Sequence, residues 1–187
     1  MIFFLLEEES MKLTLKNLLV KIVHDEPYKL ISHNGKMDLQ ASIPKIVPTL
    51  SKNINAKIVI VQDQDYHDCI DLKTKLLDLS QNAHCSILIR IACKELESWF
   101  LGDMKAIGKA FPKFKPDKYF NKKKFRNIDD IQKPSMILKK IIPELRKYEI
   151  IPKRKLAESI SVHMDLHDNK SLSFIRFISG LKKLRNK

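Results

Sequence analysis

The first hundred residues alternate between short apolar runs and longer amphipathic stretches, and this alternation limits the folds open to the chain. Four apolar runs are predicted strands: Ile2–Leu6, Tyr28–Ser32, Ala56–Gln62 and Cys85–Cys93. Each stretch between them is long enough for a helix and spaces its leucines at helical intervals. Connections of this length favour parallel strands joined by right-handed crossovers. The sequence therefore predicts an α/β fold with a mostly parallel four-stranded sheet and helices on both faces.

The chain changes character near residue 103. Residues 1–103 carry 12 Lys/Arg and 14 Asp/Glu, whereas residues 104–187 carry 23 and 8, so the net charge changes from −2 to +15. After a proline-containing loop at 111–134, helices are expected at about 135–147, 153–164 and 171–184. We predict a core at 1–103 and a basic helical region at 104–187 packed on it. A strongly basic region favours a polyanionic partner, although scattered lysines can also serve solubility alone.

Several classes of protein are disfavoured. The apolar run Ile2–Leu6 is too short to span a membrane, and three glutamates follow it, which argues against a signal peptide. The three cysteines have no CxxC spacing, so neither a disulfide framework nor a zinc site is expected. With four glycines and no glycine-rich phosphate loop, the chain is not expected to hydrolyse ATP by itself. We predict a cytoplasmic protein without membrane contact.

Acidic residues follow two of the predicted strands directly. Asp63-Gln64-Asp65 ends the β-branched run Ile58–Val61, and Glu7 follows the first strand. The carboxyl ends of parallel strands share one edge, where open α/β sheets bind ligands. Carboxylate oxygens there suit Mg²⁺ or Mn²⁺, so Glu7, Asp63 and Asp65 are candidate metal ligands. The alternative is that Asp63 caps the next helix and Asp65 is solvated.

A second group of charged residues follows the fourth strand. Glu95 and Glu97 are candidate metal ligands if both face the end of the sheet, or else first-turn acids that favour a helix dipole. Arg90 and Lys94 lie close by in sequence and are candidates for neutralising a phosphate in a transition state.

The basic half contains two clusters that suit phosphate contacts. These candidate nucleic-acid-binding residues are Lys122, Lys123, Lys124, Arg126, Lys153, Arg154 and Lys155. The aromatic residues interleaved with the basic residues of 113–126 are expected to anchor the loop to the core more than to stack on bases; they are Phe114, Tyr119, Phe120 and Phe125.

The order strand, Glu7, Ser10, helix and later strand, Asp63-Gln64-Asp65 resembles the TOPRIM fold of topoisomerases, DnaG-type primases and OLD-family nucleases. A finer resemblance, to the TOPRIM-like domain-of-unknown-function 4276 family, covers nearly the whole chain. It depends on the segments Leu6–Lys12, His33–Lys36, Asp63–Asp65, Arg90–Asp103 and Asn169–Phe174. The resemblance implies that Glu7 acts as acid/base or metal ligand and that the DxD binds Mg²⁺.

The chain departs from the TOPRIM signature at Glu8, where glycine is usual, and at Met11, where an acid is usual. Glu8 or Glu9 is therefore an alternative to Glu7 as ligand. The resemblance implies a Mg²⁺-dependent nuclease acting on DNA or RNA, working with an ABC-type or AAA-type ATPase in phage defence or genome maintenance. The alternative is a non-catalytic subunit that binds nucleic acid or protein through a degenerate site. The sequence does not set the oligomeric state.

Overall fold

The four apolar runs form one sheet in the computed structural model, which describes residues 1–23 and 25–186. Within these residues the sheet has the order β2-β1-β3-β4, and every neighbouring pair is parallel. The strands are β1 (Ile2–Leu6), β2 (Tyr28–Ser32), β3 (Lys57–Asp63) and β4 (Ser86–Ala92). The predicted α/β class and the parallel pairing are confirmed.

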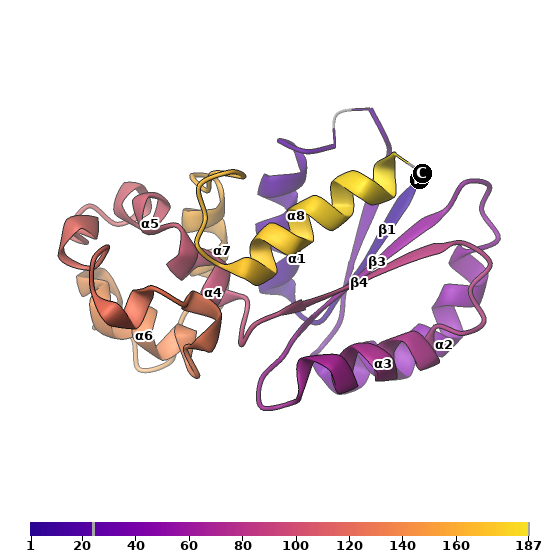
Figure 1. The fold of residues 1–187 in the computed structure, drawn as a ribbon, viewed down its shortest axis with the longest axis horizontal. Coiled ribbons are helices and arrows are strands. Elements are labelled where there is room, and N and C mark those ends of the chain that lie inside the picture. Colours follow the sequence, from indigo (N-terminus) through magenta and orange to yellow (C-terminus); the bar gives the residue numbers. More distant parts are fainter. Residues whose placement is uncertain (24, 187) are drawn as a thin grey trace.

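Helices cover both faces of the sheet (Figure 1). Because side chains alternate along a strand, Phe4 and Leu6 of β1 face one layer, while Phe3 and Leu5 face the other. The first layer holds α1 (Glu9–Leu19) and α8 (Leu172–Arg185), and the second holds α2 (Lys36–Leu50) and α3 (Cys69–Leu79). Both faces of the central strands are thus buried, which accounts for their uninterrupted apolar sequence.

Helix boundaries follow local capping chemistry. Asp68 caps α3, because its Oδ1 accepts hydrogen bonds from the amides of Ile70 and Asp71 at 2.7 and 3.1 Å. Ser10 does not cap the first helix, because α1 begins at Glu9 and the Ser10 hydroxyl donates to Glu8.

The segment between β4 and α8 forms a helical lobe, defined here as residues 97–161. Figure 1 shows it beyond the carboxyl ends of the strands. The helix expected at 135–147 is interrupted, because Pro143 cannot continue the hydrogen-bonded ladder. None of the described helices combines the length and apolar character needed to cross a membrane. The lobe contains α4 (Glu97–Gly102), α5 (Met104–Ala110), α6 (Pro134–Ile141), α7 (Lys153–Ser161) and the 3₁₀ turns η1 (Pro116–Lys118), η2 (Lys123–Phe125), η3 (Ile128–Asp130) and η4 (Pro143–Leu145).

The basic region shares its hydrophobic core with the sheet. Trp99 of α4 stacks on Phe177 of α8 with ring centroids 5.0 Å apart, and Phe174 meets it edge-on at 5.5 Å. The indole Nε1 donates to Ser173 Oγ at 3.0 Å, so this buried ring is also satisfied in hydrogen bonding. The lobe is therefore held at the end of the sheet by α8, which returns along β4. The predicted basic region ends at Lys187, which lies outside the described residues.

Candidate functional site

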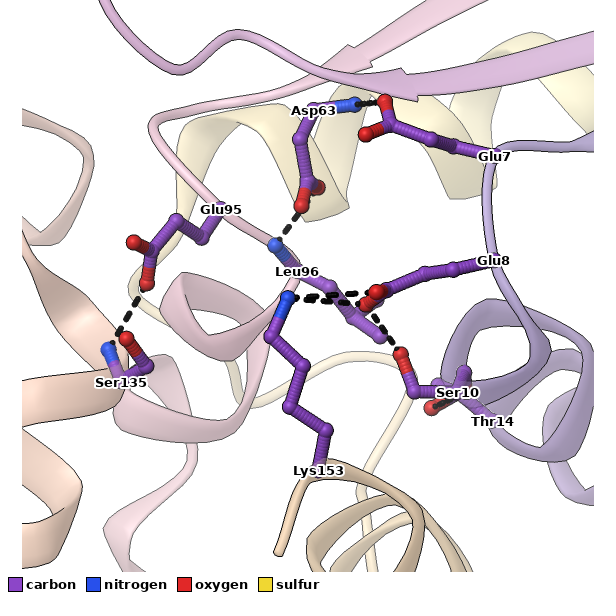
Figure 2. Close-up of polar contacts among 9 residues, drawn as sticks. All are labelled: Glu7, Glu8, Ser10, Thr14, Asp63, Glu95, Leu96, Ser135 and Lys153. Atoms are coloured by element: carbon purple, nitrogen blue, oxygen red, sulfur yellow. Dashed lines mark hydrogen bonds and ion pairs between the residues drawn. The ribbon is translucent and has the colours of Figure 1, made fainter. Parts of the chain in front are cut away.

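Two acidic segments meet where the strand order reverses. From β1 the chain adds β2 on one side and then β3 on the other, so the reversal point lies between β1 and β3, where open α/β sheets bind ligands. Glu7 follows β1, and Asp63 ends β3. Glu7 Oε2 accepts a hydrogen bond from the Asp63 amide at 3.0 Å (Figure 2). The two strand ends that the sequence singled out are therefore adjacent.

Asp63 is the innermost of these acids and is 3% exposed. Its Oδ1 accepts a hydrogen bond from the Leu96 amide at 2.8 Å, which ties β3 to the entrance of α4. Burial, together with the carboxylates of Glu97 and Glu7, raises the pKa of Asp63 well above its usual range. The side chain thus lies in a setting that favours either a proton or a cation.

Glu97 lies in the first turn of α4 and is completely buried. Neither of its carboxylate oxygens has a hydrogen-bond partner among the residues that the structure describes. Burial, opposed by the charge of Lys153, raises the pKa of Glu97 to about 7. An unpartnered buried carboxylate is expensive in free energy, so an ion or a proton is expected to compensate it.

Glu7 has a similar environment, though it is nearer the surface at 9% exposure. Burial is the main cause that raises its pKa to about 7, and the nearby carboxylates of Asp65 and Glu8 add to it. We use the term carboxylate cluster for Glu7, Glu8, Asp63 and Glu97.

Lys153, from the start of α7, enters this cluster. Its Nζ lies 3.1 and 3.2 Å from the two carboxylate oxygens of Glu8 (Figure 2). Burial alone would lower the pKa of Lys153, but the charges of Glu97, Glu8 and Asp63 raise it overall. Lys153, which the sequence grouped with nucleic-acid-binding residues, thus provides a counterion for the cluster. It reaches Glu8 because α7 packs against α1.

The second acid of the DxD points elsewhere. Asp65 has a left-handed backbone (φ 50°), and its Oδ2 accepts from Lys36 Nζ at 2.6 Å. That hydrogen bond is the main cause that raises the pKa of Lys36. Lys36 escaped the sequence prediction, although its segment, His33–Lys36, follows β2 at the same edge of the sheet.

Three other predicted residues do not join the cluster. Glu95 turns away and accepts a hydrogen bond from the Ser135 amide at 2.9 Å, at the start of α6 (Figure 2). Arg90 lies within β4, and strand alternation directs it to α8, where it donates to the Arg176 carbonyl at 2.9 Å. Lys94 meets the DxD loop through its backbone, because its carbonyl accepts from the Asp65 amide at 2.9 Å. Among the described residues, none of these three side chains forms a hydrogen bond with Asp63.

Two further polar residues near this edge have structural partners. Glu9 accepts from Ser32 Oγ at 2.7 Å, and this hydrogen bond is the main cause that lowers its pKa. His33 uses Nδ1 for the Leu6 carbonyl and Nε2 for the Ser42 hydroxyl. Of the three consecutive glutamates, Glu8 therefore reaches the cluster together with Glu7, and Glu9 does not.

The other basic residues are on the surface. Lys122, Lys123, Lys124 and Arg126 are exposed, as are Arg154 and Lys155. The aromatic rings of residues 113–126 anchor this loop to the core, as expected. Phe114 and Phe125 are buried, and Tyr119 stacks on Phe114 with ring centroids 5.2 Å apart. Lys155 Nζ contacts the Tyr148 hydroxyl at 3.0 Å.

Within the described residues, no group of three or more His, Cys, Asp or Glu side chains is arranged to hold a metal ion as it stands. The carboxylate cluster has oxygen donors of the type that hard cations prefer, but an ammonium lies among them. The arrangement can thus bind a cation, with Lys153 as the competing charge.

Comparison with protein families matches residues 6–182 to the family described as domain of unknown function (DUF4276). Comparisons with curated proteins and with solved structures give no match. Because the match spans nearly the entire chain, including both strand ends that carry Glu7 and Asp63, this protein is a member of the DUF4276 family.

Proposed function

We propose that this protein is a divalent-metal-dependent nuclease whose ion binds at the carboxylate cluster. The observation that carries the proposal is the burial of Glu7, Asp63 and Glu97 together at the strand-order reversal, with both oxygens of Glu97 lacking a partner in the described chain. Apolar side chains could pack at these positions without the free-energy cost of burying carboxylates. A cation is the simplest compensation.

The donor set fits Mg²⁺ or Mn²⁺ in kind. Asp63, Glu97 and Glu7 offer only carboxylate oxygens, and the unpartnered oxygens of Glu97 are free to be ligands. When bound, such an ion would polarise a phosphodiester and lower the pKa of a coordinated water.

The remaining steps belong to side chains of this protein. Glu7, buried next to the Asp63 amide, is the group that would accept a proton from an attacking water. Lys36 holds Asp65 next to the site through the 2.6 Å contact. Lys153 supplies positive charge beside Glu8 for contact with an incoming phosphate.

The relationship to TOPRIM nucleases, the substrate and the partner are proposed from resemblance alone. The strand-end Glu and DxD arrangement is similar to that of TOPRIM nucleases, and we include TOPRIM ancestry in the proposal. By the same analogy we propose DNA or RNA as the substrate and an ABC-type or AAA-type ATPase as a partner in phage defence or genome maintenance.

The test is cleavage of labelled DNA and RNA by purified protein with Mg²⁺, Mn²⁺ or EDTA. Asp63→Asn keeps an oxygen for the Leu96 amide while removing the charge, and Asp78→Asn on the exposed side of α3 is the matched control. Metal-dependent cutting by wild type and by Asp78→Asn, but not by Asp63→Asn, is expected. Cutting that survives unchanged in Asp63→Asn would remove this site assignment.

A second function has one observation in its favour. Because Lys153 already neutralises part of the cluster, and no three donors are gathered for an ion in the described residues, the site suits a non-catalytic nucleic-acid-binding or protein-binding subunit as well. Salt-sensitive binding without any metal-dependent cutting would select this alternative.

A further inference from the structure

A solvent-accessible cavity lies in the helical lobe, outside the carboxylate cluster. It has a volume of about 740 Å³ and is open to solvent between η2, η3 and the start of α6. Four cations line it: Lys123, Lys124, Arg126 and Lys133. We use the term basic pocket for this cavity.

The four positively charged side chains of the basic pocket lack carboxylate partners among the described residues. None of the four forms an ion pair in the part of the chain that the structure describes, and Asp130 is the acidic residue among the lining. Lys153 and Lys36, by contrast, are both paired with carboxylates. Unpaired cations around a concave surface favour an anionic ligand.

The rest of the lining suits more than a bare phosphate. Ile131 and Ile137 offer apolar surface, and the exposed amides of Asn127 and Gln132 offer donors and acceptors at the same cavity. This combination of apolar surface, hydrogen-bonding edge and cations matches the base and phosphate of one nucleotide. The volume is in the usual range for such a ligand.

The basic pocket is connected to the carboxylate cluster through α6. Lys133 precedes this helix and Ile137 lies in its first turn, while the Ser135 amide between them binds Glu95 at 2.9 Å. Glu95 is itself close enough to Glu97 to raise its pKa. The basic pocket and the carboxylate cluster are therefore linked through the start of α6.

We propose that the basic pocket seats one unpaired nucleotide of a single-stranded nucleic acid that continues toward the carboxylate cluster. The choice of substrate rests on the proposed nuclease function, whereas nucleotide binding in the basic pocket stands without it. A base held in a duplex cannot enter the cavity, because its hydrogen-bonding edge is already paired and its faces are stacked.

The test measures binding by fluorescence anisotropy, in EDTA, on the Asp63→Asn background so that cleavage does not interfere. The probes are ten-nucleotide single strands of DNA and RNA and a blunt duplex of the same length. Asn127→Ala/Gln132→Ala removes the amides without changing charge, and Gln81→Ala/Asn82→Ala, an exposed pair after α3, is the matched control. Lys133→Ala is paired with Lys140→Ala, an exposed lysine of the same helix.

Asn127→Ala/Gln132→Ala is expected to weaken single-strand binding by about tenfold, for roughly two hydrogen bonds, and to leave duplex binding unchanged. Lys133→Ala is expected to weaken single-strand binding about fivefold at low salt, with Lys140→Ala close to wild type. Equal affinity for duplex and single strand, or pocket variants that bind like their controls, would overturn the proposal. Pocket-dependent binding without metal-dependent cutting by wild type would instead count against the nuclease function alone.

Discussion

The carboxylate cluster and the basic pocket hold charge in opposite ways. In the cluster, Glu7, Asp63 and Glu97 are buried against one another at the end of the sheet, and their pKa values rise as a result. In the basic pocket, four positively charged side chains are exposed around an open cavity, where water screens their charges. The cluster thus carries a large free-energy penalty in the absence of a counterion, whereas the pocket carries a small one.

This contrast indicates a division of roles. A buried, tightly constrained set of acids is suited to chemistry or to tight cation binding, because its geometry and charge are fixed before a ligand arrives. An exposed set of cations is suited to weak, salt-sensitive positioning of a polyanion. Substitutions in the two regions should therefore differ in kind as well as in size.

The largest expected difference is in cleavage. Asp63→Asn and Glu97→Gln should each lower metal-dependent cutting on the order of a hundredfold or more, because loss of a ligand exceeds loss of a supporting contact. Variants of the basic pocket should lower it about tenfold or less at low substrate concentration and recover at saturation. Rates measured across substrate concentrations check this, and comparable loss of the maximal rate in both regions would break the distinction.

Stability against pH should distinguish the cluster next. The folded-state pKa values of Glu7 and Glu97 are about 7 against an ordinary 4.5, so the folded state holds these protons more tightly than the unfolded state. Without metal, the contribution of these two groups to the free energy of unfolding should therefore be most favourable below pH 4.5. It should fall as the pH rises to about 7 and then level off. A shift of this size corresponds to on the order of 3 kcal/mol for each acid if they act independently.

Glu97→Gln removes one share of this pH dependence. At pH 8 the variant should be more stable than wild type by about 1–3 kcal/mol, and at pH 4 the two should be similar. Urea unfolding at both pH values measures the difference, with Glu158→Gln on the exposed side of α7 as control. A variant less stable than wild type at pH 8 would mean that the Glu97 carboxylate has a partner that this account lacks.

Removal of the internal counterion should have a somewhat smaller effect. Lys153→Met leaves Glu8 and Glu97 without their nearest positive charge and should destabilise the protein at pH 8 by about 2 kcal/mol. This figure is reduced from the fully buried case because the Lys153 side chain is 39% exposed. Mn²⁺ should stabilise this variant more than wild type, since the competing ammonium is gone. Lys155→Met is the control, and equal Mn²⁺ effects in all three proteins would contradict the competition.

The smallest effect concerns salt. Arg126→Ala in the basic pocket should weaken single-strand binding a few-fold at low salt and reduce the slope of log affinity against log salt by about 1. Arg146→Ala, an exposed arginine after η4, should leave the slope nearly unchanged. Anisotropy titrations over a range of salt concentrations compare the two.

The sheet and the adjacency of Glu7 and Asp63 could be predicted because both depend on local pattern. Continuous apolar runs define parallel strands, and parallel strands bring their carboxyl ends to one edge. The same reasoning failed one or two residues further on. Asp65 takes a left-handed backbone and Glu95 caps α6, and neither result follows from spacing alone.

The places of Lys153 and Arg90 depend on tertiary packing. Lys153 was grouped with its basic neighbours in sequence, but α7 packs on α1 and turns this one lysine inward to Glu8. Arg90 was grouped with Lys94 and Glu95, but α8 returns from the far end of the chain to accept its hydrogen bond. Contacts between segments 86 and 145 residues apart are not encoded in any local motif.

The most direct test of the cluster as a cation site is a crystal structure of the protein soaked in Mn²⁺, with the ion located by its anomalous signal. The account predicts one ion held at about 2 Å by carboxylate oxygens of Asp63 and Glu97, with Glu7 beside it and Lys153 withdrawn from Glu8. A saturating soak that leaves Lys153 on Glu8 and the cluster without an ion would contradict it.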